Sequence, residues 1–450
     1  MCTDSSPDRR AAAFVADLEL NLIDDAAVKQ VVDIVADSFA AIVGGIDTEG
    51  SDEFAELSDD RYSGEASILG TDVGTTTMNA ALVNGTAGTA LELDEGHKFA
   101  AGHPAMHVLP AILAETEVTD RDGRTFLEAF TAGYEIAARA GIAAQPLHKS
   151  YHMHGIWGTV GGAAAVAHVR EFDVDQTLCA MRIGANHALH TRFETGHEGA
   201  TLRNSYAGMS NMNAIVACDQ AEAGFTALDD GIRRHLDRVS ETSFDVDALT
   251  DGLGERWEVT CGYFKCHAAC RYTHGALDAV ARLQTKHDLT AADCRSVRVE
   301  TYETAATLLD PHPKNSLAAK FSIPFAVATR LCRGTSGKRA FTTDALTEET
   351  IEVAERVTVE TSPDLEARVP EARSTRVTVK TRDGYEYAEF VEHAQGDHRN
   401  PFTDKRLREK YHALTDPVLG REQASELHDA VTELPDVTPA TLTALATPDE

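Results

Sequence analysis

The sequence predicts a mostly α fold, with a large helical-bundle domain and a smaller α+β domain. Apolar residues recur at helical spacing through the first 275 residues, whereas the alternation typical of strands appears between residues 276 and 398. Ala and Gly are abundant in the helical part, and aromatic residues make up only 6% of the chain, a composition typical of closely packed helices. We therefore expect three segments: residues 1–275 form the first part of the helical domain, 276–398 form the α+β domain, and 399–450 return to the helical domain as C-terminal helices.

A long amphipathic helix is predicted at residues 26–43. Val28, Val31, Val35 and Phe39 share one face at helical spacing, and charged residues fall on the other. Since small residues let helices approach closely, we expect this helix to pack in a bundle with later segments of similar character. These segments are 75–93, 126–144, 158–172 and 211–227.

The α+β domain is predicted from short alternating runs. The expected strands are 296–302, 356–360 and a hairpin at 375–391, and the expected helices are 319–332 and 346–356. Asp383-Gly384 supplies the turn of the hairpin. A further helix follows Asn400, with Thr403 or Asp404 as its N-cap.

The charge of the chain excludes several classes of partner. The formal net charge is −31, from 72 acidic and 41 basic side chains, and the acidic residues are spread along the whole chain. Such a surface repels nucleic acids and anionic membranes, so we expect neither as a partner. The acidic residues do not repeat at the spacing of a calcium-binding loop. We interpret them as a solvated surface adapted to high salt, which indicates a halophilic archaeon as the source.

Cysteine usage and hydropathy indicate a cytoplasmic protein. No apolar run approaches the roughly 20 residues that a membrane span needs, and no signal peptide is recognisable. The eight cysteines are irregularly spaced, so we expect reduced thiols and no disulfide bonds.

Four polar clusters interrupt the apolar pattern and hold most of the 19 histidines: 92–107, 148–154, 187–203 and 265–274. Adaptation to salt explains acidic residues but not histidines gathered at helix ends. A zinc site is one alternative, but the cysteines near His267 lack paired C-x-x-C knuckles, and no H-E-x-x-H helix is present. We therefore expect no metal.

Acid/base chemistry without a cofactor fits the clusters better. Removing a proton next to a carboxylate needs a base near neutral pH, an acid for a leaving hydroxide, and cations to hold the substrate. Histidine suits the first two roles, and lysine and arginine suit the third. In a chain of charge −31, a local gathering of cations predicts a small polycarboxylate as the substrate. The candidates are His97, Lys98, His103, His152, His154, Arg203, Lys265, Arg271 and His274.

Three carboxylates, Glu92, Asp94 and Glu95, stand beside the first histidines. A carboxylate next to a histidine can orient the ring, fix its tautomer and raise its basicity. The alternative is a solvated acidic loop. A nucleophilic role for Cys270 is a weaker hypothesis than a buried, inert thiol.

The clusters, in this order, resemble the MmgE/PrpD family, which includes 2-methylcitrate dehydratase, cis-aconitate decarboxylase and an iminodisuccinate epimerase. The resemblance covers nearly the whole chain. It is carried by ALELDEGHKFAAGHPAMHVLPAILAETE at 90–117, YHMHGIWGTVGGAAAVA at 151–167, YFKCHAACRYTHGALDA at 263–279, KFSIPFAVA at 320–328 and NPFTDKRLREKY at 400–411.

The resemblance implies a helical domain made from both ends of the chain, an α+β lid, a homodimer, and a cleft that works without a cofactor. The residues that match the family's catalytic positions are Glu92, Asp94, His103, His152 and Lys265. We expect the following residues to bind substrate: His97, Lys98, His154, Arg203, Arg271, Tyr272 and His274.

Three departures from the decarboxylase-like branch bear on the substrate. Glu95-Gly96 stands where that branch has Asp-Thr, Met209 aligns with one of its lysines, and Cys270 falls at or near one of its histidines. The loss of a cation and a hydroxyl argues against decarboxylation of cis-aconitate. We therefore expect a dehydratase acting on a 2-methylcitrate-like polycarboxylate. The alternatives are an epimerase or isomerase of an iminodisuccinate-like dicarboxylate, a cis-aconitate-type decarboxylase, and a binding protein without activity.

Overall fold

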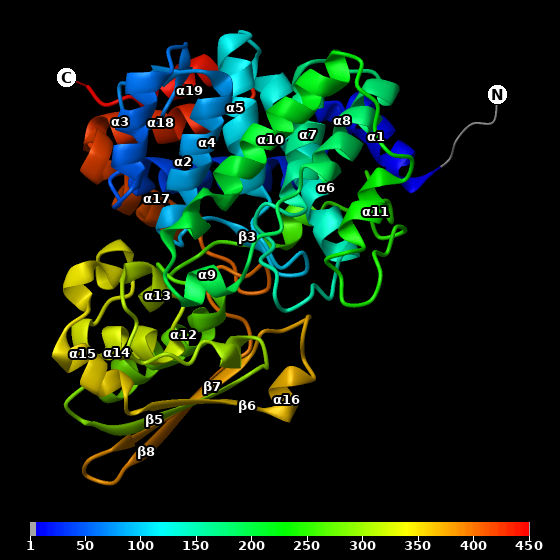
Figure 1. Ribbon diagram of the computed structural model, residues 1–450. Helices are drawn as coiled ribbons and strands as arrows, with labels where there is room; N and C mark the ends of the chain where they lie inside the picture. Colours follow the sequence, from blue (N-terminus) through cyan, green and yellow to red (C-terminus); the bar gives the residue numbers. More distant parts are fainter. Residues whose placement is uncertain (1–5, 450) are drawn as a thin grey trace.

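A computed structural model describes residues 6–449, and it confirms the predicted fold class. A large helical body carries a smaller sheet-containing lid on one side (Figure 1). The helices of the body from the first part of the chain are α1 Pro7–Asp17, α2 Asp25–Gly45, α3 Ser51–Arg61, α4 Thr77–Ala90, α5 Leu109–Val118, α6 Gly123–Ala143, α7 Gly158–Val169, α8 Val174–Asn186, α9 Glu194–His197, α10 Ser205–Glu222 and α11 Gly231–Leu236.

Small residues bring the central helices into close contact. A β-carbon on Gly161 of α7 would lie 2.4 Å from the Ala137 β-carbon of α6 and 2.6 Å from the Gly133 carbonyl oxygen. Larger side chains at these positions would force the two helices apart. Around this contact the core is filled by fully buried aromatic residues such as Phe126, Phe130 and Trp157.

The C-terminal segment returns to the helical body, as the sequence predicted. Its helices are α17 Asp404–Leu419, α18 Arg421–Thr432 and α19 Pro439–Leu445. The Thr403 hydroxyl caps α17 by accepting a hydrogen bond from the Arg406 amide at 3.2 Å. Lys410 of α17 pairs with Asp37 of α2 at 2.5 Å, which ties the two ends of the chain together. Figure 1 shows the red C-terminal helices beside the blue N-terminal ones.

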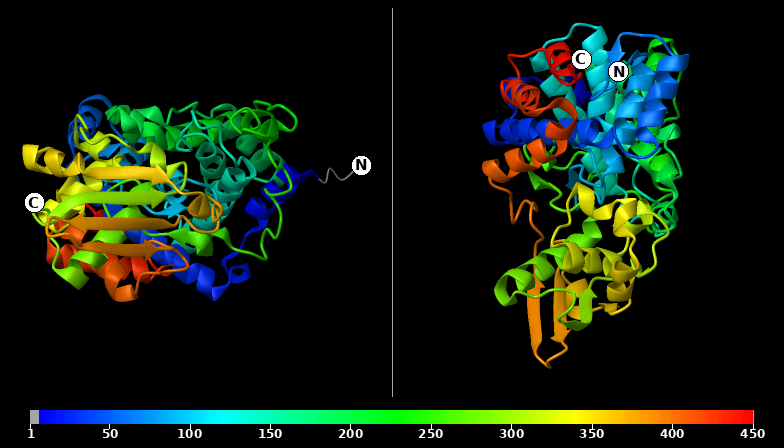
Figure 2. Two further views of the ribbon diagram at one scale, coloured as in Figure 1. Left: turned by 90° about the horizontal axis from the view of Figure 1, so that it is seen from below. Right: turned by 90° about the vertical axis from the view of Figure 1, so that its left-hand side faces the viewer.

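The lid is a four-stranded sheet in the order β6-β5-β7-β8, in which β5 is parallel to β6 and antiparallel to β7. Its α12 and α14 cover one face, while the other face is turned outward (Figure 2). The elements are α12 His274–His287, β5 Cys294–Thr301, α13 Ser316–Lys320, α14 Ile323–Arg333, α15 Glu348–Ala354, β6 Val357–Thr361, α16 Pro363–Glu366, β7 Thr375–Thr381 and β8 Glu386–Val391.

Two details of the lid bear on the sequence predictions. The hairpin β7–β8 forms as expected, with Gly384 at φ +97° in its turn. The single helix expected at 319–332 is wrong, because α13 ends at Lys320 and α14 begins at Ile323. Ser322 caps α14 by accepting from the Phe325 amide at 3.0 Å, and Pro324 in the first turn has no N–H to continue α13.

Two short ribbons complete the fold. One pairs β1 Ala66–Ser67 with β2 Gly74–Thr75. The other pairs β3 Gly96–His97 with β4 Gly262–Tyr263, and it lies where the body faces the lid (Figure 1). Pairing of β3 with β4 brings together two polar clusters that are more than 150 residues apart in the sequence.

Within residues 6–449, no helix is both long and apolar enough to cross a bilayer. The seven cysteines in this range are free thiols, and Cys2 lies outside it.

Candidate active site

The loop after α4 presents two buried carboxylates. Glu92 has φ 55°, a left-handed conformation that costs a residue with a β-carbon roughly 1–2 kcal/mol. Glu92 and Asp94 are 1% and 0% exposed. Lys265 donates to Glu92 Oε2 at 2.9 Å and to Asp94 Oδ1 at 3.1 Å. Arg203 pairs with the second oxygen of Glu92. Two cations therefore hold two carboxylates in a dry, strained loop.

These ion pairs set the protonation states. Burial would raise the pKa of both carboxyls, but Arg203 and Lys265 outweigh it for Glu92, and Lys265 together with the hydrogen bond from His103 outweighs it for Asp94. Both pKa values lie below their usual range, so both groups are ionised at neutral pH. Burial would lower the pKa of Lys265, yet the two carboxylates raise it, so the lysine stays charged.

Backbone contacts from distant elements hold the same loop. Lys410 of α17 donates to the Leu93 carbonyl at 2.7 Å, and Lys320 of α13 donates to the Ala90 carbonyl at 2.7 Å. Burial lowers the pKa of Lys320 to about 8. Both lysines are less than 10% exposed. The body and the lid thus each contribute a cation that fixes where the loop lies.

His103 is oriented for proton transfer at Nε2. Its Nδ1 lies 3.0 Å from Asp94 Oδ2 and 2.5 Å from the Glu95 carbonyl oxygen. Since both neighbours are acceptors, Nδ1 carries the proton. The neutral ring then has its lone pair on Nε2.

His152 has the opposite tautomer. Its Nδ1 accepts a hydrogen bond from the His154 amide at 3.1 Å, so the proton of the neutral ring is on Nε2. Burial, together with the nearby Arg203 charge, holds the pKa of His152 well below its usual value. His152 is therefore neutral and presents an N–H at Nε2, whereas His103 presents a lone pair at Nε2.

His154 lies between these two rings. Its centroid is 4.6 Å from that of His103 and 4.6 Å from that of His152, and its Nε2 contacts Arg203 Nη2 at 3.3 Å. Behind it, burial lowers the pKa of His107 to about 3. The stacked rings are neutral, and they pack against the base rather than exchanging protons with solvent.

A pocket opens between these groups and the lid. Its lining is Glu92, Ala101, His103, His152, Met153, Phe193, Arg203, Tyr263, Cys270, Arg271, Tyr272, Phe321 and Arg373. The cavity volume is about 30 Å³. Since one water needs roughly 10–15 Å³ of such space, the pocket as it stands holds about two waters. Both domains line it, so a larger ligand enters only when the lid moves away from the body.

The lid side of the pocket is cationic and aromatic. The Arg271 guanidinium lies 4.3 Å from the centroid of the Tyr263 ring and donates to the Gln395 carbonyl at 3.1 Å. Gly96 makes room for that tyrosine, because a β-carbon on residue 96 would lie 2.4 Å from the Tyr263 ring. Because residue 96 of β3 is a glycine, the Tyr263 ring has room to form this wall of the pocket.

Glu95, whose backbone carbonyl contacts His103, carries a protonated carboxyl group. Glu95 accepts from the Tyr134 hydroxyl at 2.6 Å and from the Ala105 amide at 3.2 Å. Burial raises the pKa of Glu95 to about 8, so its side chain is neutral at pH 7. The three acidic residues of the loop therefore differ, since two are ionised and the third is not.

Six of the twelve residues predicted from the sequence line the pocket, namely Glu92, His103, His152, Arg203, Arg271 and Tyr272. Three more contact lining residues: Asp94 lies 3.0 Å from His103, Lys265 lies 2.9 Å from Glu92, and His154 lies 3.3 Å from Arg203. His97 is buried beside Glu258, with its Nε2 3.4 Å from Glu258 Oε2. His274 lies behind Arg271 and contacts its Nη1 at 3.3 Å. Lys98 lines a neighbouring pocket instead. Neither His97 nor His274 lines either pocket, and their ring nitrogens face other protein groups, so substrate contact by these two residues stays a prediction.

Two residues bear on the sequence departures. Arg203, six residues before Met209, pairs with Glu92 and lines the pocket, so this segment supplies a cation even though Met209 is not one. Cys270 does line the pocket, but burial raises the pKa of its thiol to about 11, so the thiol is protonated at neutral pH.

Sequence reasoning missed six lining residues: Ala101, Met153, Phe193, Tyr263, Phe321 and Arg373. Tyr263 precedes Lys265 in a motif already singled out, so its position could have flagged it. Arg373 stands in a loop with no motif around it, and only the fold brings it to the site.

One trio among residues 6–449 has metal-ligand geometry. The donor atoms of Asp94, His103 and His154 lie within 4.8 Å of one another. Lys265 already contacts Asp94, and Arg203 contacts His154, so a metal ion would face two positive charges. These residues suit proton transfer better than metal binding.

Comparisons with known proteins identify the family of this chain. Residues 9–235 match the MmgE/PrpD N-terminal domain, and residues 267–435 match the MmgE/PrpD C-terminal domain. The chain is 24% identical over 470 residues to the cis-aconitate decarboxylase-like protein oryM of Aspergillus oryzae, covering 96% of each chain. It is 25% identical to the cis-aconitate decarboxylase of Aspergillus terreus, with 80% of this chain and 79% of that protein aligned.

A mammalian protein is similar at the same level. The cis-aconitate decarboxylase of Mus musculus is 23% identical over 448 residues, which cover 95% of this chain and 90% of the mouse protein. The two family domains together span most of the sequence, in the order in which the helical body and the lid follow each other. The chain belongs to the MmgE/PrpD family.

Proposed function

We propose that this protein is a lyase that acts on a small polycarboxylate, and that the reaction is the loss of water from a hydroxy acid. His103 Nε2 removes a proton from the carbon next to a carboxylate. The bond to the hydroxyl group breaks, a carbon–carbon double bond forms, and the hydroxide leaves as water with the proton that His103 took up. His152 Nε2–H donates a hydrogen bond to the departing oxygen.

The observation that carries this proposal is the pair of opposite tautomers. The contacts of His103 Nδ1 with Asp94 and Glu95 leave its Nε2 as a base, while the His154 amide makes His152 a donor at Nε2. Elimination of water needs a base and a donor in one pocket. Histidine held neutral can still stabilise a developing oxyanion. The chain's own side chains supply both groups, and we propose that no cofactor takes part.

Decarboxylation is the second candidate, and the relatives favour it. Several similar proteins are named cis-aconitate decarboxylase, and Arg203 supplies a cation for a substrate carboxylate. In that reaction carbon dioxide leaves and the resulting carbanion takes a proton. His103 would then have to enter the reaction protonated, the reverse of the role that its contacts favour at neutral pH.

Proton NMR in deuterated buffer with molar KCl distinguishes these reactions. The panel is 2-methylcitrate, citrate, cis-aconitate and iminodisuccinate. A new alkene signal from a hydroxy acid supports dehydration, and a product one carbon shorter supports decarboxylation. Deuterium entering a substrate whose skeleton is unchanged indicates an epimerase. No turnover and no exchange with any of the four would overturn the proposal.

The variant His103→Asn tests the base. Asparagine keeps a donor near the position of Nδ1 but has no base at the position of Nε2, so turnover should fall by about 10²–10⁴-fold. His148→Asn is the matched control, because His148 is exposed and lies outside the pocket. Equal activity in the two variants would refute the role of His103.

A further inference from the structure

The charges of the catalytic centre are balanced before substrate arrives. Lys265 and Arg203 each pair with a carboxylate of the loop, Glu92 or Asp94. These two cations and two carboxylates sum to zero, and the stacked histidines are neutral. The centre alone therefore offers no net positive charge to a substrate with two or three carboxylates.

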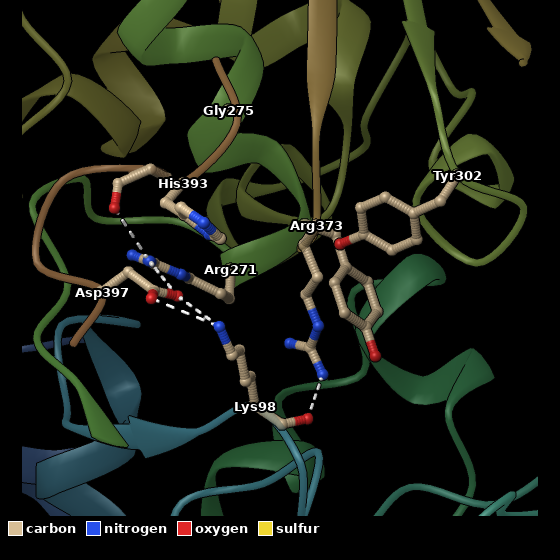
Figure 3. Close-up of a pocket in the computed structure, with 9 residues that line it drawn as sticks. Lys98, Arg271, Gly275, Tyr302, Arg373, His393 and Asp397 are labelled. Carbon is tan, nitrogen blue, oxygen red and sulfur yellow. Dashed lines mark hydrogen bonds and ion pairs between the residues drawn. The ribbon is translucent and has the colours of Figure 1, made fainter. Parts of the chain in front are cut away.

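A second small pocket adjoins the first on the lid side (Figure 3). Three residues, Arg271, Tyr272 and Arg373, line both pockets and so form the wall between them. The lining of the second pocket is Lys98, Arg271, Tyr272, Gly275, Tyr302, Arg373, His393, Ala394 and Asp397.

The second pocket carries excess positive charge. Lys98 and Arg271 share one carboxylate, since Asp397 lies 3.3 Å from Lys98 Nζ and 3.8 Å from Arg271 Nη2. Arg373 is the third cation. Three positive charges against one carboxylate leave an excess of two, and Lys98, Arg271 and Asp397 are all less than 10% exposed. An excess charge held away from water is costly unless an anion balances it.

Arg373 makes no ion pair with any carboxylate in residues 6–449. Its Nη2 donates to the Lys98 carbonyl at 2.6 Å, and its guanidinium lies 5.3 Å from the centroid of the Tyr272 ring. Burial raises the pKa of both Tyr272 and Tyr302, so these phenols are uncharged and do not neutralise it. Figure 3 shows the hydrogen bond from the Arg373 guanidinium to the backbone of Lys98. Its remaining N–H groups are available for a ligand.

We propose that Arg373, together with Arg271, binds the substrate carboxylate farthest from the reacting carbon. This inference rests on the proposed function for the reacting end of the substrate and adds a selectivity to it. A planar guanidinium binds a carboxylate through two parallel hydrogen bonds, which suits recognition of a third carboxylate. Substrates without that group lose the contact, so the subsite selects tricarboxylates over dicarboxylates.

The same contact joins the substrate to lid closure. Arg373 belongs to the lid, in the segment between α16 and β7, and it donates to a carbonyl of the body. A carboxylate bound to Arg373 is therefore held by the lid, while the reacting carbon faces His103 of the body. Binding energy from the remote carboxylate then favours the closed arrangement in which His103 reaches the substrate.

Calorimetry with two unreactive ligands tests the subsite in molar KCl. Tricarballylate has three carboxylates, and methylsuccinate is the same molecule with one terminal carboxylate replaced by hydrogen. The full-length protein should bind tricarballylate at least 10-fold more tightly. Arg373→Gln should weaken tricarballylate binding by about 10- to 100-fold and leave methylsuccinate nearly unchanged. Equal losses for both ligands, or none, would overturn the inference.

Two further variants complete the design. Arg376→Gln is the matched control, because Arg376 is a partly exposed arginine of β7 that pairs with Glu300 and Asp364. It should bind both ligands like the wild type. Arg373→Lys keeps the charge but not the paired hydrogen bonds, so it should lose part of the preference for tricarballylate. If Arg373→Gln does not fold, an unchanged preference in Arg373→Lys overturns the inference.

The outcome is separable from that of the proposed function. If no polycarboxylate is turned over but the preference for tricarballylate depends on Arg373, the subsite stands and the lyase proposal fails. If a polycarboxylate is turned over and the preference does not depend on Arg373, the lyase proposal stands and the subsite fails.

Discussion

Replacing Lys265 by methionine should destabilise the helical body by about 3–4 kcal/mol at pH 7 and by less than half as much at pH 5. Lys265 is fully buried and contacts two carboxylates, at 2.9 and 3.1 Å. At an effective dielectric constant of about 20, each pair is worth roughly 5 kcal/mol, much of which desolvation of the ammonium offsets. Methionine fills a similar volume, so lost packing contributes little.

The size of the loss is limited by proton uptake. Without Lys265, the folded chain can protonate Asp94, whose pKa in the unfolded chain is about 3.9, and this step sets an upper limit on the loss. Holding that proton at pH 7 costs about 1.4 kcal/mol for each of roughly three pH units, or about 4 kcal/mol. At pH 5 the same step costs about 1.5 kcal/mol. The folded variant binds one more proton than its unfolded chain, so its stability rises as the pH falls.

In the wild type, Asp94 should not contribute this slope. The pKa of Asp94 is lowered in the folded protein, so its contribution to stability is present above the unfolded pKa and is lost only as the pH falls below about 4. Any slope that other groups, such as Glu95, give between pH 5 and 7 is common to the wild type and the variant and cancels in the difference between them.

Urea unfolding at constant KCl, followed by tryptophan fluorescence, measures the difference. The chain has 2 tryptophans, and both Trp157 and Trp257 are buried in the helical body. Lys29→Met is the matched control, because Lys29 is exposed and its pairs with Asp33 and Asp404 lie on the surface. That variant should change stability by less than about 1 kcal/mol. A loss below 1 kcal/mol for Lys265→Met, or the same loss at pH 5 and 7, would refute the reasoning.

Three further results are expected. The pKa of Glu95 is raised to about 8, so the wild type should lose stability as the pH rises from 5 to 8. Glu95→Gln has no such group and should gain about 1.4 kcal/mol per pH unit relative to the wild type. Parallel curves of stability against pH for the two proteins, measured by urea titration, would contradict this. Gly96→Ala should lower kcat/KM and cost about 1–3 kcal/mol of stability, since its β-carbon would collide with Tyr263, and the same substitution should cost less when it is made in Tyr263→Ala. For an anionic substrate, kcat/KM should rise as KCl increases from 0.1 to 1 M, because salt screens the charge of −31; a steady fall would show that the cationic pocket dominates the approach.

The helices and strands were largely predictable, because their signals are local. The amphipathic pattern of residues 26–43 corresponds to α2, and the alternation around Asp383-Gly384 corresponds to β7 and β8. The break between α13 and α14 was missed, although Ser322 and Pro324 carry its signal. Helical periodicity continued across these two residues, and it was given more weight than the cap and the proline.

The site was only partly predictable, because chemistry identifies residue types but not their directions. His97 and His103 stand in the same short segment, yet only His103 faces the pocket. Which way each ring points depends on the pairing of β3 with β4, a contact between distant segments. Arg373 could not be predicted for the same reason, since nothing near it in the sequence marks it as a ligand-binding residue. The roles of base and donor depended on individual hydrogen bonds, which no sequence pattern reports.

The loop after α4 is held by residues that are synthesised at different times. Its carboxylates and carbonyls are held by Arg203, Lys265, Lys320 and Lys410, which leave the ribosome one after another. Glu92 and His103 are synthesised in the first quarter of the chain, but the last of these cations follows some 300 residues later. A growing chain therefore contains its acid and base long before it contains an active site. A message truncated shortly before residue 410 would yield every proposed catalytic side chain and no catalyst.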